Sequence, residues 1–167
     1  PPTLTMPMSR QISGIVLLKN TIDAFVVAHE LGHNLGLGHS NLERCSNGKR
    51  DDIWTNCRAI EYGSATDVMS NNDRSSTLAA YHLWRLGIIP NTDVVEALQT
   101  RTVALRPVSD TSGTRAIFIR DNTAAYWVEY RSADPVHDIE AGLVIYRTDP
   151  PPGSSVQSPF ESDAADP

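Results

Sequence analysis

Three histidines and one glutamate lie close together in the sequence, at a spacing that could build a metal site. The stretch from His29 to His39 fits the pattern His-Glu-x-x-His-x-x-Gly-x-x-His, with Glu30, His33 and Gly36 at its other fixed positions. On an α-helix, His29 and His33 are one turn apart on the same face, about 6 Å along the axis, so both imidazoles can bind one ion. If Gly36 takes a left-handed conformation, the chain can leave the helix sharply and bring His39 to the same ion.

This arrangement predicts a catalytic zinc site rather than a structural one. Three protein ligands leave the fourth position of a tetrahedral zinc ion open to water. Glu30 follows the first histidine, so we expect it to act as the general base that takes a proton from this water and relays it to the leaving amine. The other two histidines, His82 and His137, lie outside any such pattern, and we expect them to be ordinary hydrogen-bonded residues.

Two helices are expected around this site. A short apolar run at 15–18 predicts a buried strand, and a helix that carries the zinc motif should follow it over about 21–36. A helical stripe of apolar residues predicts a second helix over about 75–87. Each helix begins near good capping residues, which are Asn20 and Thr21 for the first and Ser75 or Ser76 for the second.

The segment 40–74 is rich in polar and turn-forming residues, so we expect it to be irregular and pinned by a disulfide or a metal. For the only two cysteines, Cys45 and Cys57, we favour a disulfide, which would stabilise the fold by roughly 3 kcal/mol and suit an oxidising compartment. The alternative is two unrelated thiols. Calcium binding by the loop aspartates is a further alternative, but their spacing is unlike that of an EF-hand, and we favour a solvated surface for Asp51, Asp52, Asp67 and Asp73.

The second half of the chain has the pattern of β-structure. Turn residues separate runs of β-branched and aromatic residues, which predicts an antiparallel region over 93–149. The final segment, 150–167, is rich in Pro, Ser and Asp and predicts a loop or tail. Trp127 and its neighbouring tyrosines either pack in the core or form the contact surface of a small β-rich binding domain, and we favour the core. The expected strands are 102–105, 116–120, 126–130 and 143–146.

Composition and charge argue against two classes of function. The net charge is −6, with acidic and basic residues interspersed, so the chain offers no basic surface for nucleic acid. No apolar stretch is long enough to span a membrane. The first residues lack the basic start and apolar core of a signal peptide, so either a targeting segment has been removed or the chain begins inside a longer protein.

The zinc motif resembles that of the metzincin clan of zinc endopeptidases, and the likeness extends over roughly residues 22–148. The second signature of the clan, a methionine-containing turn, has its counterpart at 67–70, and the resemblance implies that Met69 forms a hydrophobic floor under the ligand histidines. The thirty residues between His39 and Met69 are more than matrixins have, and the gametolysin-like family is the closer match. Its further features here are the cysteine pair, Glu61-Tyr62-Gly63, a helix ending Leu86-Gly87, and β-segments at 126–131 and 142–147.

The resemblance implies an α+β fold, in which a partial zincin catalytic domain is followed by an antiparallel β-rich extension. Asn71 stands where some metzincins have a tyrosine ligand, so no fifth ligand is expected. About twenty residues precede the active-site helix, so we expect most of the upstream subdomain, whose edge strand binds substrate, to be lacking. The expected regions are 1–92 for zinc binding and catalysis, 93–149 for the β-rich part and 150–167 for the tail.

The function implied is that of a secreted zinc endopeptidase, which hydrolyses peptide bonds of extracellular proteins. Its expected partner is a protein or peptide substrate, and we expect no binding of nucleic acid and no segment that spans a membrane. The alternative is a truncated metzincin that binds zinc without hydrolysis and serves in recognition or adhesion. Glu30 argues against this alternative, because a structural zinc site has no need of a general base.

Overall fold

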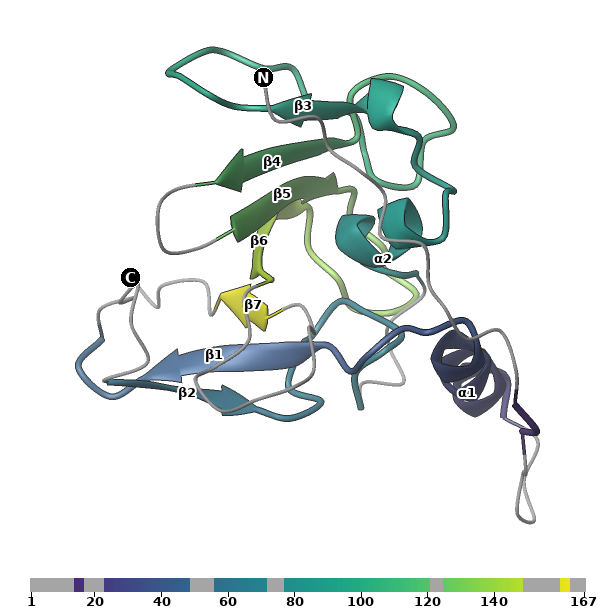
Figure 1. Ribbon diagram of the computed structural model, residues 1–167. Helices are drawn as coiled ribbons and strands as arrows, with labels where there is room; N and C mark the ends of the chain where they lie inside the picture. Colours follow the sequence, from purple (N-terminus) through teal and green to yellow (C-terminus); the bar gives the residue numbers. More distant parts are fainter. Residues whose placement is uncertain are drawn as a thin grey trace.

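The computed structural model of the chain contains both helices and strands, which confirms the expected α+β class (Figure 1). It describes residues 14–16, 23–48, 56–71, 77–120 and 125–148, together with the backbone of 160–162. In chain order the elements are α1 (Ala24–Asn34), β1 (Asn41–Cys45), β2 (Cys57–Ile60), α2 (Ala80–Arg85), the 3₁₀-helix η1 (Asn91–Asp93), β3 (Val94–Glu96), β4 (Ala116–Arg120), β5 (Ala125–Arg131), β6 (Gly142–Arg147) and β7 (Phe160–Ser162).

The strands are hydrogen-bonded in the order β2-β1-β7-β6-β5-β4-β3. Strands β4, β5 and β6 pair antiparallel, as expected for the second half of the chain, whereas β3 runs parallel to β4 and β1 parallel to β7. Because β7 lies within 150–167, the prediction of a loop or tail is wrong for 160–162. Figure 1 shows α1 beside the start of β1, at a distance from the strands of the second half.

Helix α1 carries the first two histidines of the zinc motif. The side chain of Asp23 accepts hydrogen bonds from the backbone N–H groups of Phe25 and Val26, at 2.7 and 3.4 Å. Asp23 is therefore the N-cap, and the helix begins later than the expected residue 21. At the other end Gly36 has a φ of 82°, so the left-handed exit from the helix is confirmed.

Helix α2 packs against β5 and forms the main core with the sheet. The rings of Trp84 and Phe118 lie against Trp127, with centroids 5.0 and 5.2 Å away. Trp127 is only 1% exposed, which confirms that it packs in the core, whereas Tyr126 and Tyr130 are half-buried. The helix covers the six residues Ala80–Arg85 and is shorter than the expected 75–87.

A disulfide-linked hairpin stands where an irregular segment was expected within 40–74. Strands β1 and β2 pair antiparallel, with Leu42 opposite Ile60 and Cys45 opposite Cys57. The predicted disulfide between the two cysteines is confirmed. The prediction of an irregular segment is wrong here because the polar composition hid two short strands, which are stabilised by pairing with each other rather than by their own propensity.

Two other strand predictions are wrong. Side chains at 102–105 alternate between exposed and half-buried, as in a strand. The run is not a strand, however, because no described strand forms hydrogen bonds with it. Residues 14–16 form no strand and Ile15 is 85% exposed, so the buried strand at 15–18 is wrong for its first half.

Some expected features lie outside the described residues, and no described helix is long and apolar enough to cross a membrane. The features outside are the second half of 15–18, the capping residues Asn20, Thr21, Ser75 and Ser76, the aspartates Asp51, Asp52 and Asp73, and the tail apart from 160–162.

Candidate metal centre

The three histidines of the motif meet at one point. The Nε2 atom of His33 lies 3.2 Å from Nε2 of His29 and 3.1 Å from Nε2 of His39. Nitrogen ligands bound to a tetrahedral zinc ion at 2.0–2.1 Å are about 3.3 Å from each other, so the spacing fits one zinc ion. His29 is buried, and His33 and His39 are half-buried.

Each of the three rings is oriented through its other nitrogen. The partners of the Nδ1 atoms are the backbone carbonyl of Val68 for His29 at 2.9 Å, that of Leu37 for His33 at 3.0 Å, and Oε1 of Glu61 for His39 at 2.9 Å. All three partners are acceptors, so each Nδ1 carries the proton and each Nε2 directs a lone pair to the common point. Three lone pairs at this spacing repel one another unless a cation lies between them.

The turn after α1 brings His39 to the other two histidines. Gly36 takes the left-handed conformation that reverses the chain, and the segment beyond it is tied down twice. The N–H of Leu37 donates to the carbonyl of Gly32 at 2.9 Å, and the N–H of Ser40 donates to the carbonyl of Met69 at 2.7 Å. The position of His39 therefore depends on the end of the helix and on the turn at 67–70.

Met69 packs directly against the helix that carries His29 and His33. It is fully buried, and a Cβ atom added to Gly32 would lie 2.3 Å from its sulfur, so α1 can approach this closely only with glycine at that position. The residue before it, Val68, supplies the carbonyl that binds His29. The turn thus contacts α1 at Gly32 and binds His29 through Val68, and the hydrophobic floor under the three histidines stays a prediction.

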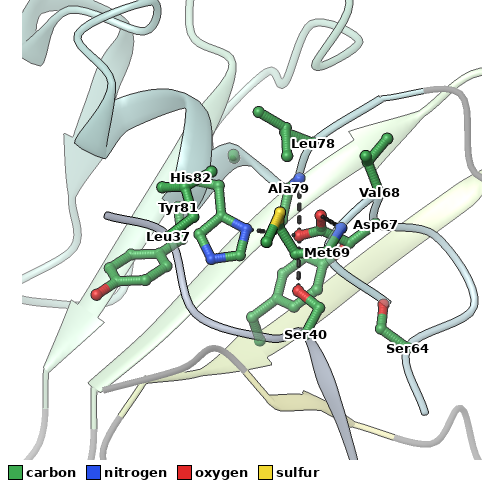
Figure 2. Close-up of polar contacts among 12 residues, drawn as sticks. Leu37, Ser40, Ser64, Asp67, Val68, Met69, Leu78, Ala79, Tyr81 and His82 are labelled. Atoms are coloured by element: carbon green, nitrogen blue, oxygen red, sulfur yellow. Dashed lines mark hydrogen bonds and ion pairs between the residues drawn. The ribbon is translucent and has the colours of Figure 1, made fainter. Parts of the chain in front are cut away.

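Asp67 begins this turn and is fully buried, so the expectation of a solvated surface is wrong for it (Figure 2). Burial alone would raise the pKa of Asp67, but the nearby His82 and the hydrogen bonds from His82, Met69 and Ser40 lower the pKa to about 2. His82 is itself buried and pairs with Asp67 through Nδ1 at 2.9 Å. It is a hydrogen-bonded residue of α2, as expected, and so is His137, which contacts Asp134 at 2.6 Å.

Two buried carboxylates from distant segments cap the N-terminus of α2. Its N-cap residue, Ala79, has no side-chain acceptor. Instead, Asp67 accepts a hydrogen bond from the N–H of Ala79 at 3.1 Å, and Glu129 of β5 accepts one from the N–H of Ala80. Glu129 also pairs with Arg131 at 2.5 Å. These bonds fix α2 between the turn at 67–70 and the sheet.

Glu61 and Tyr62 are site residues to which the sequence analysis assigned no role. The ring of Tyr62 lies 3.8 Å from that of His39 and 5.9 Å from that of His29, measured between centroids. Its φ of 60° is uncommon for a residue other than glycine, and such strain is concentrated at functional sites. The one signal for them in the sequence is the segment Glu61-Tyr62-Gly63, which is among the features that resemble the gametolysin-like family.

Burial favours the neutral, metal-binding form of His39. Burial lowers the pKa of His39, the hydrogen bond that it donates to Glu61 raises the pKa, and the charge of His33 lowers it again, with a net decrease. Burial and the charges of Glu61 and Glu30 raise the pKa of Tyr62. The side chain of Glu30 is exposed.

A second group of potential ligand atoms does not form a metal site. Glu43 lies close to Cys45 and Cys57, but both sulfurs are in the disulfide and offer no thiolate. Glu43 instead faces Arg147 at 3.5 Å.

Comparisons with models of known protein families, with curated proteins and with solved structures gave no match. The assignment of function therefore depends on the residues and the geometry of the site.

Proposed function

We propose that this protein is a zinc-dependent endopeptidase of the metzincin type, similar to the gametolysin-like family. In this proposal His29, His33 and His39 hold the zinc ion and Glu30 is the general base. The observation that carries the proposal is the convergence of three histidine rings: Nε2 of His33 lies 3.2 Å from that of His29 and 3.1 Å from that of His39, and the opposite nitrogen of each ring donates to an oxygen. This is the ligand arrangement that a metal-binding histidine requires.

The donor set favours zinc over the other common divalent ions. Imidazole nitrogens suit zinc and the later transition metals, whereas calcium and magnesium prefer oxygen ligands. Three protein ligands also agree with a catalytic zinc site, which keeps one position open. A zinc ion held there would lower the pKa of a bound water to about 7 and polarise the carbonyl of a peptide bond.

Glu30 is the group that would handle the proton in peptide hydrolysis. It directly follows His29 in α1, and its side chain is exposed. Its carboxylate can accept a proton from the attacking water and pass it to the leaving amine nitrogen. A site used only to stabilise a fold would gain nothing from a free carboxylate in this position.

An extracellular location forms part of the proposal. The disulfide between Cys45 and Cys57 is stable in an oxidising compartment, and no described helix is able to span a membrane. We therefore propose that the substrates are extracellular proteins or peptides.

Zinc content and peptide cleavage test the proposal together. We expect elemental analysis to find one zinc ion per chain, and a peptide library to be cleaved in the absence of a chelator only. Cleavage should return when zinc is added back to the chelated protein. Protein without zinc would overturn the proposal. Stoichiometric zinc without cleavage would favour the non-hydrolytic recognition module instead.

A variant of Glu30 separates the role of the base from that of the metal. We expect Glu30→Gln to keep its zinc and to lower kcat by about 100-fold or more, because general-base catalysis contributes roughly 10²–10⁴-fold. Glu140→Gln, at an exposed glutamate just before β6, is the matched control and should leave the zinc content and kcat unchanged. Unchanged cleavage by Glu30→Gln would contradict the assigned mechanism.

A further inference from the structure

Asp67 joins three segments of the chain, and Figure 2 shows its contacts with Ser40, Ala79 and His82. Its Oδ2 atom accepts hydrogen bonds from the hydroxyl of Ser40 at 2.7 Å and from the N–H of Ala79 at 3.1 Å, and lies 2.9 Å from Nδ1 of His82. Its Oδ1 atom accepts a hydrogen bond from the N–H of Met69 at 2.8 Å. A single buried carboxylate therefore binds donors from the segment after α1, from the turn at 67–70 and from α2.

One of these hydrogen bonds acts on the ring of His29. The N–H of Met69 and the carbonyl of Val68 belong to the same planar peptide group. Asp67 holds the N–H side of this group, while the carbonyl side binds Nδ1 of His29 at 2.9 Å. Asp67 thus sets the direction of the acceptor that orients His29.

A second hydrogen bond acts on His39. Ser40 is the next residue and is fully buried, and its hydroxyl donates to Asp67. The N–H of Ser40 belongs to the peptide group that follows His39, and it donates to the carbonyl of Met69 at 2.7 Å. The backbone at His39 is therefore held on two sides by the turn that Asp67 organises.

His82 anchors Asp67 to the core. It lies in α2, which packs against β5, and its side chain is completely buried. Its Nε2 atom has no hydrogen-bond partner in the described part of the chain, and a proton there would leave a buried donor unsatisfied. His82 therefore donates to Asp67 through Nδ1.

We propose that Asp67 is a positioning residue of the metal centre: its buried carboxylate, anchored by His82, holds the ligands His29 and His39 in register through the Val68–Met69 peptide group and through Ser40. This inference rests on the proposed zinc function. It concerns residues that touch neither the ion nor the substrate, so its effect should be on metal affinity and ligand geometry.

The test compares two buried carboxylates that cap the same helix. Glu129 accepts a hydrogen bond from Ala80 in α2, as Asp67 does from Ala79, but its other partners are Arg131 and Tyr146 of the sheet, and it bonds directly to neither Ser40 nor Met69. Glu129→Gln is therefore the matched control for Asp67→Asn. Both variants lose a buried charge and should unfold more easily than the wild type.

Only Asp67→Asn should change the metal centre. We expect its zinc affinity, measured by competition with a chromogenic chelator at neutral pH, to fall about tenfold or more, as is typical when groups that orient metal ligands are altered. We also expect a changed visible absorption spectrum when cobalt(II) replaces zinc, because this spectrum reports the geometry of the ligands. Glu129→Gln should keep the wild-type affinity and spectrum.

Ser40→Ala provides a smaller change, which serves if Asp67→Asn does not fold. It removes one hydroxyl donor and should shift the cobalt spectrum in the same direction. Affinity and spectrum equal to those of Glu129→Gln would overturn the positioning role and leave the proposed function intact. A wild-type protein that binds no zinc would overturn the proposed function as well, and the wild-type measurement alone reveals this.

Discussion

His39 and Glu61 are 22 residues apart in the chain, yet Nδ1 of the histidine lies 2.9 Å from Oε1 of the glutamate. Glu61 directly follows β2, and His39 lies just before β1. The register of this hairpin, which pairs Leu42 with Ile60, brings the two side chains together. Glu61 is the one charged acceptor among the three Nδ1 partners, so the hairpin contributes a carboxylate to the candidate metal centre.

Removal of this carboxylate should weaken zinc binding. We expect Glu61→Ala to lower zinc affinity about tenfold, at the low end of the range for residues that orient a ligand, because the side chain is 69% exposed and water can replace it. Glu61→Gln should have a smaller effect, since its amide oxygen still accepts a hydrogen bond. Chelator competition measures both variants, with Glu140→Ala as the control. An affinity equal to that of the control would show that Glu61 does not orient His39.

The contact between Gly32 and Met69 should not tolerate a methyl group. Alanine at a helical position gains about 1 kcal/mol of propensity over glycine. A Cβ atom at 2.3 Å from the buried sulfur overpacks the core, which costs about 1–3 kcal/mol, so a net loss of stability is expected for Gly32→Ala.

Urea unfolding of the zinc-free protein measures the effect of Gly32→Ala. Gly142→Ala is the control, because no atom lies within 4 Å of the added methyl group there. If the clash is its cause, Gly32→Ala should cost less stability in a Met69→Ala background than in the wild type. A stabilised Gly32→Ala variant would contradict the close packing of the turn against α1.

The low pKa of Asp67 predicts a specific loss of stability in acid. The folded-state pKa is about 2, below the ordinary value of 3.8, so the unfolded chain binds the proton more tightly. The ionised carboxylate therefore stabilises the fold above pH 3.8, by about 2 kcal/mol, and this contribution is lost as the pH falls from about 4 through about 2. The difference in free energy of unfolding between the zinc-free wild type and Asp67→Asn should shrink over this range. A difference in free energy of unfolding that does not change with pH would show that the ionised form of Asp67 does not stabilise the fold.

The disulfide should stabilise the hairpin without being required for the metal ligands. Its two cysteines are separated by 12 residues, and closure of a loop of this size contributes about 3 kcal/mol on the chain-entropy model. We expect the double variant Cys45→Ser with Cys57→Ser to lose about this much stability in urea and to keep stoichiometric zinc at low temperature. Loss of zinc from a folded double variant would show that the hairpin, through Glu61, controls the site more strongly than expected.

The sequence alone was sufficient to identify the group of histidines, because their relationship is largely local. His29 and His33 are one helical turn apart, and Gly36 permits the sharp exit that returns His39, so the spacing itself restricts where the rings can lie. The paired strands β4, β5 and β6 were also predictable, since each contains a run of β-branched and aromatic residues.

Only the tertiary structure decided which residues surround the histidines. Asp67 was expected on a solvated surface, and Glu61 had no assigned role, because their partners are other segments of the chain. The β1–β2 hairpin was missed for the same reason, since its strands gain stability from each other rather than from their composition. Spacing along a helix is encoded within a few neighbouring residues, whereas the environment of a buried carboxylate is set by distant segments packed together, and no local pattern records it.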